Sequence, residues 1–153
     1  MAPSPQTDLG GNNVLQMGKT SNGEQTTLTL VAGAKKKFTF DHSFDSFAPG
    51  ADNFVSQADV FAALGVPIIE NVVNGFNSTL LAYGQTGSGK SFSMTGGDGA
   101  DAGVIPRLCS ALFSRLSEHE HAMNKVTVEV EYFEIYSEKV YDLLAPNKKG
   151  AVQ

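Results

Sequence analysis

The feature that most constrains the fold is a short apolar run that ends in a cluster of glycines. Residues 79–83 (TLLAY) are almost entirely apolar, and glycine then occupies positions 84, 87 and 89, just before a lysine and a serine. A short, continuous apolar run is typical of a strand buried on both of its faces. Glycine lets the chain turn tightly, and residues 90–94 can begin a helix. The sequence therefore predicts a buried strand, a tight loop and a helix in succession.

The loop matches the phosphate-loop pattern G-x-x-x-x-G-K-S/T at every position. Its residues are Gly84, Gln85, Thr86, Gly87, Ser88, Gly89, Lys90 and Ser91. Small residues let backbone N–H groups converge on a phosphate, and the following helix adds the positive end of its dipole. Lys90 can reach the outer phosphates, and the Ser91 hydroxyl can bind Mg²⁺. We therefore predict that a nucleoside triphosphate binds here; a glycine-rich turn with an ordinary surface lysine is the alternative.

A helix is predicted before the loop. Apolar residues recur with helical spacing through residues 56–76, and either Ser56 or Asp59 can cap its start. Pro67 is expected to kink this helix because proline has no N–H to donate, and Gly75 is expected to mark its end.

Other segments complete the pattern of an α/β protein. Strands are predicted at residues 25–33 and 38–44, with His42 on the buried phenylalanine face of the second. A further strand is predicted from residue 126, and its alternation slips by one at Phe133 and Ile135, which indicates a bulge or burial on both faces. Residues 96–103 are expected to be a flexible interruption, after which a helix beginning near Pro106 buries an apolar stripe that includes Ile105 and Cys109. Strands alternating with helices around a glycine loop predict an α/β P-loop NTPase.

Charge and composition exclude several classes of partner. The formal net charge is −5, which gives no reason to expect nucleic acid or an anionic membrane as partner. The chain has one cysteine, no apolar run of membrane-spanning length and no signal-peptide pattern at its start. We therefore expect a cytoplasmic protein without membrane insertion.

Hydrolysis needs more than the loop. An acidic residue at the end of a buried strand is expected to organise Mg²⁺, and no run of four apolar residues followed by aspartate occurs. Glu129, Glu131 and Glu134 follow a strand pattern typical of solvent-facing residues, and the apolar run before Asp142 is too short. The residues thus support binding, and no complete catalytic set is predicted.

Five segments in register resemble the kinesin motor domain. They are FTFDHSF (38–44), VVNGFNSTLLAYG (72–84), AYGQTGSGKSFSMTG (82–96), GVIPRLCSALFSRL (103–116) and EVEYFEIYSEKVYDLL (129–144). The resemblance implies a central sheet flanked by helices, incomplete in this chain, with ATP and Mg²⁺ at the loop and Ser91 as the metal contact. It also implies tubulin as partner, a microtubule-associated location, and Phe92 beside the adenine; packing of Phe92 in the core is an equal alternative. The amino-acid sequence of these segments is most similar to that of the vesicle-transporting subfamily.

The chain also departs from the family pattern. It contains neither the N-x-x-S-S-R-S-H nor the D-L-A-G-S-E switch motif, and the R-x-R-P motif is absent from its first strand region. We expect an N-terminal arm at residues 1–24, a partial motor domain at 25–146 and a tail at 147–153. A catalytically inactive short module that binds nucleotide or a protein partner is the alternative. A small P-loop phosphotransferase, for which Arg107 would be the lid residue, is a further one.

Overall fold

The computed structural model describes residues 15–19, 25–31, 34–119, 126–146 and 151–152. Most of the predicted arm (residues 1–14 and 20–24) and of the predicted tail (147–150 and 153) lies outside these ranges. The chain divides into two units, Met1–Arg115 and Leu116–Gln153. Among the helices of the described ranges, none is long and apolar enough to cross a membrane.

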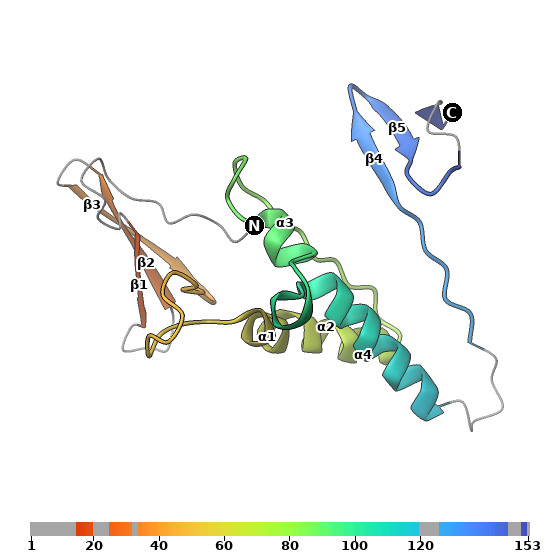
Figure 1. Cartoon of the computed structure of the whole chain (residues 1–153), viewed down its shortest axis with the longest axis horizontal. Coiled ribbons are helices and arrows are strands. Elements are labelled where there is room, and N and C mark those ends of the chain that lie inside the picture. The colour runs from red at the N-terminus through yellow and green to blue at the C-terminus, as the bar shows by residue number, and fades with distance from the viewer. Residues whose placement is uncertain (1–14, 20–24, 32–33, 120–125, 147–150, 153) are drawn as a thin grey trace. The chain divides into compact units, whose positions relative to one another are not determined.

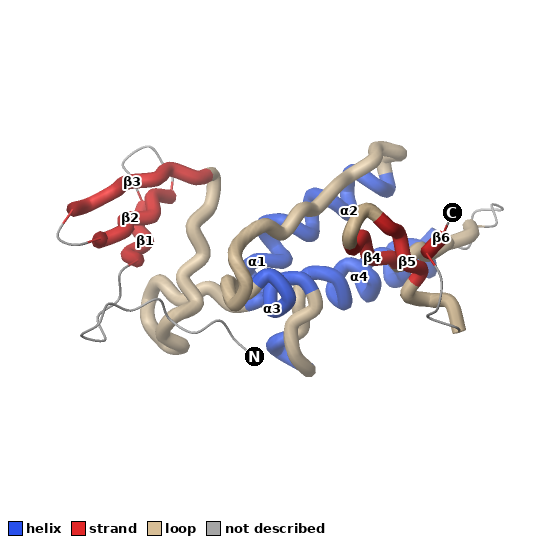
Figure 2. The backbone as a smooth tube through the Cα atoms, turned by 90° about the horizontal axis from the view of Figure 1, so that it is seen from above, coloured by secondary structure: helices blue, strands red, loops and turns tan. Residues whose placement is uncertain are grey.

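The first unit begins with a three-stranded antiparallel sheet (Figures 1 and 2). Its strands, in spatial order, are β1 (Leu15–Lys19), β2 (Gln25–Val31) and β3 (Ala34–Phe40). The strand predicted at residues 25–33 is thereby confirmed as β2. The strand predicted at 38–44 ends early at Phe40, whose side chain is 52% exposed, so its expected buried face was wrong. An aromatic face is buried only where a second layer covers it. His42 instead stacks on Phe44, with ring centroids 5.5 Å apart.

A helical segment follows, built from three parts. They are α1 (Gln57–Val60), the π-helix η1 (Phe61–Gly65) and α2 (Val66–Val73). Ser56 caps the start: its hydroxyl accepts from the N–H of Asp59, whose carboxylate accepts from the Ser56 N–H. Pro67 lies in the first turn of α2, where its missing N–H costs least, directly after the wide π turn. The helix ends before Gly75, as predicted, where φ is +83°.

The predicted strand at residues 79–83 does not form. Residues 76–84 have no regular secondary structure, and the side chains of Leu81 and Tyr83 are 83% and 95% exposed. A strand forms only when another strand pairs with its backbone. Within the described part of the chain, no backbone hydrogen bond from another segment reaches residues 79–83. The expectation of a strand buried on both faces was therefore wrong for this structure.

The helices after the loop are α3 (Lys90–Met94), the 3₁₀ turn η2 (Gly99–Asp101) and α4 (Val104–His119). The predicted helix start at residue 90 is confirmed. Residues 96–103, expected to be flexible, form a bridged turn in which the Gly97 N–H donates to the Asp101 carbonyl (2.9 Å). The buried side chains of the described residues are Gln57, Ile69 and Val104.

The apolar stripe predicted for the second helix is largely uncovered. Val104, the first residue of α4, is 2% exposed, whereas Ile105 is 44% exposed and Cys109 is exposed, so the expected burial of these two residues was wrong. Helical spacing identifies an apolar face, and its burial requires a layer against it.

The second unit holds a small antiparallel sheet of order β4-β5-β6. Its strands are β4 (Phe133–Tyr136), β5 (Lys139–Asp142) and β6 (Ala151–Val152). Ser137 and Glu138, both with positive φ, form the two-residue turn between β4 and β5, which is the geometry that favours a tight hairpin. Residues 126–132 carry no regular structure, so the first part of the strand predicted from residue 126 was wrong, whereas its continuation at Phe133 and Ile135 is confirmed as β4. The α/β class holds, with antiparallel sheets in the described residues.

Candidate phosphate-binding loop

The loop of residues 84–91 is shaped by glycines in left-handed backbone conformations. Gly87 has φ +80° and Gly89, the residue that caps α3, has φ +89°. Residues with a Cβ atom adopt such conformations at a cost, so glycine suits both positions. Between them the Ser88 N–H donates to the Gln85 carbonyl at 3.2 Å, which closes a tight turn. The predicted tight loop is therefore present.

Lys90 ties the two ends of this loop together. Its ammonium nitrogen donates to the carbonyl oxygens of Gly84 and Gln85, each at 2.7 Å. Lys90 is also the first residue of α3, so one side chain joins the start of the helix to the start of the loop. A cation is thereby held at the loop itself, within a chain of negative net charge.

The loop presents backbone donors that nothing else in the described residues uses. The N–H groups of Gly87, Gly89, Lys90 and Ser91 have no hydrogen-bond acceptor within the part of the chain that the structure describes. Successive unpaired N–H groups around a left-handed turn form a concave site that suits an anion. This donor set, with the ammonium beside it, fits phosphate oxygens.

A divalent metal would find one protein ligand here. The Ser91 residue is exposed, and no cluster of three or more histidine, cysteine, aspartate or glutamate residues occurs in the described ranges. A hydroxyl is a hard oxygen ligand of the kind that Mg²⁺ accepts, and phosphate oxygens commonly complete such a site. Ser91 thus fits a metal that arrives together with phosphate.

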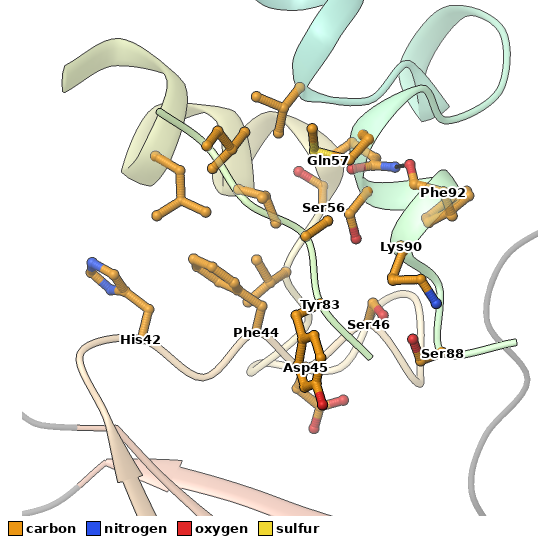
Figure 3. Close-up of a pocket in the computed structure, with 18 of the residues that line it drawn as sticks. His42, Phe44, Asp45, Ser46, Ser56, Gln57, Tyr83, Ser88, Lys90 and Phe92 are labelled. Atoms are coloured by element: carbon orange, nitrogen blue, oxygen red, sulfur yellow. Dashed lines mark hydrogen bonds between the residues drawn. The ribbon is translucent and has the colours of Figure 1, made fainter. Parts of the chain in front are cut away.

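A cavity of about 730 Å³ opens next to the loop (Figure 3). Ser88, Lys90 and Phe92 line it from the loop and α3, and Phe44 lines it from the segment after β3. Phe92 is half-buried and borders this cavity, a position compatible with both roles considered for it. Its contact with adenine stays a prediction.

Two residues have roles that the sequence did not indicate. Gln57 is buried and donates from its amide nitrogen to the carbonyl of Phe92 at 2.6 Å. No local signal marks it, because polar residues are ordinary in the first turn of a helix. The guanidinium of Arg107 donates to the carbonyls of Ala102 (2.8 Å) and Ala100 (2.9 Å), which braces the turn after α3. Both hydrogen bonds of Arg107 thus go to backbone carbonyls of the neighbouring turn, and nothing in its geometry favours the role of a lid residue in a phosphotransferase.

The model of the kinesin motor domain matches residues 6–153 of this chain. The chain belongs to the kinesin motor domain family. The kinesin-like protein unc-104 of Caenorhabditis elegans is 44% identical to it over 133 residues, which are 84% of this chain and 8% of that protein. This kinesin chain thus spans a small part of its curated relative, and the resemblance inferred from its motifs is confirmed.

Solved kinesin structures share the fold. The Drosophila kinesin family member NOD in complex with AMPPNP matches with a TM-score of 0.72 and 31% identity, over 99% of this chain and 49% of NOD. A structure of KIF14 with ADP, in complex with a microtubule, matches with a TM-score of 0.71 and 29% identity, over 99% of this chain and 42% of that one. The predicted fold class, a P-loop α/β domain of the kinesin type that is incomplete here, is confirmed.

Proposed function

We propose that residues 84–91 bind the phosphates of ATP together with Mg²⁺. The observation that carries the proposal is the arrangement of the loop: Lys90 holds its start through two carbonyl oxygens while the N–H groups of Gly87, Gly89 and Ser91 stay unpaired. Neutral N–H donors beside a fixed cation provide a favourable site for a polyanion.

Each residue has a distinct part in this proposal. Gly87 and Gly89 set the curvature that points the N–H groups inward, and Lys90 supplies the positive charge. Ser91 offers its hydroxyl to Mg²⁺, and Gln85, Thr86 and Ser88 contribute backbone to the curl. A bound Mg²⁺ would neutralise phosphate charge. Phe92 is proposed to lie beside the adenine.

We further propose that these residues are the nucleotide-binding part of a motor that couples ATP hydrolysis to movement along microtubules. The match to NOD with AMPPNP supports the choice of ATP, and the match to KIF14 on a microtubule supports tubulin as partner and a cytoskeletal location. Turnover requires groups beyond the loop that sense the γ-phosphate, so binding is the activity proposed for these 153 residues.

Titration with a fluorescent ATP analogue in the presence of Mg²⁺ tests the proposal. We expect saturable binding by the native chain and loss of at least about 90% of the affinity in Lys90→Ala, since charged hydrogen bonds to phosphate are among the strong ones. Lys139→Ala, which removes an exposed lysine from β5, is the matched control and should bind as the native chain does. Equal affinity of the native chain and Lys90→Ala would refute the assignment.

The metal is tested separately. Ser91→Ala should weaken binding measured with Mg²⁺ and leave the weaker binding measured in EDTA unchanged, because only the metal-dependent part passes through the hydroxyl. A loss of the same size with and without Mg²⁺ would assign Ser91 a structural role instead.

A further inference from the structure

Gln57 is the buried polar side chain of the described residues, with 7% of its surface exposed. It is the first residue of α1, and the reciprocal hydrogen bonds between Ser56 and Asp59 fix the start of that helix around it. Its amide nitrogen donates to the Phe92 carbonyl at 2.6 Å and makes a longer contact of 3.4 Å with the Asp101 carbonyl. A buried amide is retained where it satisfies partners of this kind.

The Phe92 carbonyl needs this donor. In a regular helix it would accept from Gly96, yet the N–H groups of Thr95 (2.9 Å) and Gly96 (3.0 Å) both donate to the Ser91 carbonyl. The Gln57 amide donates to the Phe92 carbonyl in place of the Gly96 N–H. A side chain from outside α3 therefore supplies one of the hydrogen bonds that the backbone of a regular helix would make.

The position of α3 decides where the loop residues point. This helix has five residues, of which Lys90 and Ser91 are the first two. A helix so short has little stability of its own and depends on tertiary contacts for its place. The contact to Gln57 reaches it from 35 residues away in the chain.

We propose that Gln57 is a positioning residue for the phosphate loop: its amide holds α3 so that Lys90 and Ser91 meet the ligand in register. The inference rests on the proposed function of residues 84–91 and adds a residue outside the loop to that site. Gln57 lines the cavity beside the loop, and the shorter of its two printed hydrogen bonds is to the backbone of α3, so the proposed effect on a ligand passes through that helix.

The test uses the full chain, the fluorescent ATP analogue and Mg²⁺. Gln57→Ala is expected to weaken binding about tenfold, because it leaves a carbonyl of α3 without its partner. Asn74→Ala is the matched control: it also removes an amide that donates to a helix carbonyl, that of Glu70 at 2.9 Å, at the far end of the same helical segment. It should bind within about twofold of the native chain, because that bond is exposed. Equal effects of the two variants would overturn the inference.

A double-mutant cycle separates positioning from general destabilisation. If Gln57 acts by placing Ser91, Gln57→Ala should cost clearly less affinity in a Ser91→Ala background than in the native one. Additive losses would overturn the inference and leave the proposed function intact. Absence of binding by the native chain would instead refute the proposed function.

A third measurement needs no variant and decides the case if Gln57→Ala does not fold. Coupling is reciprocal: if the Gln57 bond favours nucleotide binding, then bound nucleotide must strengthen that bond. Hydrogen exchange of the Gln57 side-chain NH₂, followed by NMR in the native chain, should therefore slow on addition of the ATP analogue while that of Asn74 stays unchanged. An unchanged Gln57 rate at saturating analogue would overturn the inference.

Discussion

The ammonium group of Lys90 lies 2.7 Å from the carbonyl oxygen of Gly84, six residues earlier in the chain. The two residues mark the first and the seventh positions of the phosphate-loop pattern, so the cation that is proposed to meet phosphate also closes the loop around it. Loop shape and loop charge thus depend on the same side chain. Changes at this position are therefore expected to affect both at once.

Lys90→Arg separates charge from geometry. Arginine keeps the positive charge, but its planar fork cannot place one compact cation against the two carbonyls of Gly84 and Gln85. We expect an affinity for the fluorescent ATP analogue between those of the native chain and Lys90→Ala. Full native affinity in Lys90→Arg would show that charge alone suffices.

Gly89 tests the left-handed backbone of the loop. Gly89 has φ +89°, in the left-handed region of backbone conformations. Asparagine should be tolerated at this position better than a β-branched residue, because asparagine adopts left-handed conformations more readily. We expect Gly89→Asn to lose little stability and Gly89→Val to lose about 1–3 kcal/mol. Urea unfolding of both variants measures the difference, and equal midpoints would contradict the strain argument.

Local signals explain what the sequence predicted well. Ser56 and Asp59 are alternative candidates for the helix cap in the sequence, and the structure shows that Ser56 is the cap and that Asp59 hydrogen-bonds back to it. The loop and the start of α3 follow equally from short-range chemistry, because glycine spacing determines the turn. These features depend on residues only a few positions apart.

Features that depend on distant neighbours were not predictable in the same way. The apolar run at residues 79–83 and the alternation at residues 126–132 predict strands, yet such patterns show which residues could be buried and not which segment pairs with them. Gln57 is buried beside the carbonyl of Phe92, to which it donates a hydrogen bond and which lies 35 residues later in the chain. The spacing of residues within its own helix therefore gives no sign of this contact. The candidate loop was thus predicted, and its support from α1 was not.

The stability that the cap of α1 contributes depends on pH through the Asp59 carboxylate. The Ser56 hydroxyl, followed by the Ser56 backbone N–H, hydrogen-bonds this carboxylate and lowers the pKa of Asp59 from its ordinary value of 3.8. Because the folded pKa is the lower one, its contribution to stability is present above pH 3.8 and is lost as pH falls through the folded pKa. Ser56→Ala and Asp59→Asn should both flatten the fall in melting temperature between about pH 5 and pH 2. An unchanged slope in both variants would contradict this account.

Gly103 offers a test of how firmly the end of α3 is enclosed. A Cβ atom at Gly103 would lie 2.6 Å from the Met94 carbonyl oxygen, a backbone atom that cannot swing away as a side chain can. Gly103 also donates its N–H to the Thr95 carbonyl at 2.9 Å, which holds it against the helix. We expect Gly103→Ala to cost about 1–3 kcal/mol in urea unfolding, as overpacking does. It should also weaken binding of the ATP analogue, because α3 must shift and its first residues are Lys90 and Ser91.

Gly97→Ala is the control, since its added Cβ would meet only the Asp101 side chain at 3.3 Å. If Gly103→Ala matches Gly97→Ala in both stability and affinity, the end of α3 is free to move and the loop does not depend on its enclosure.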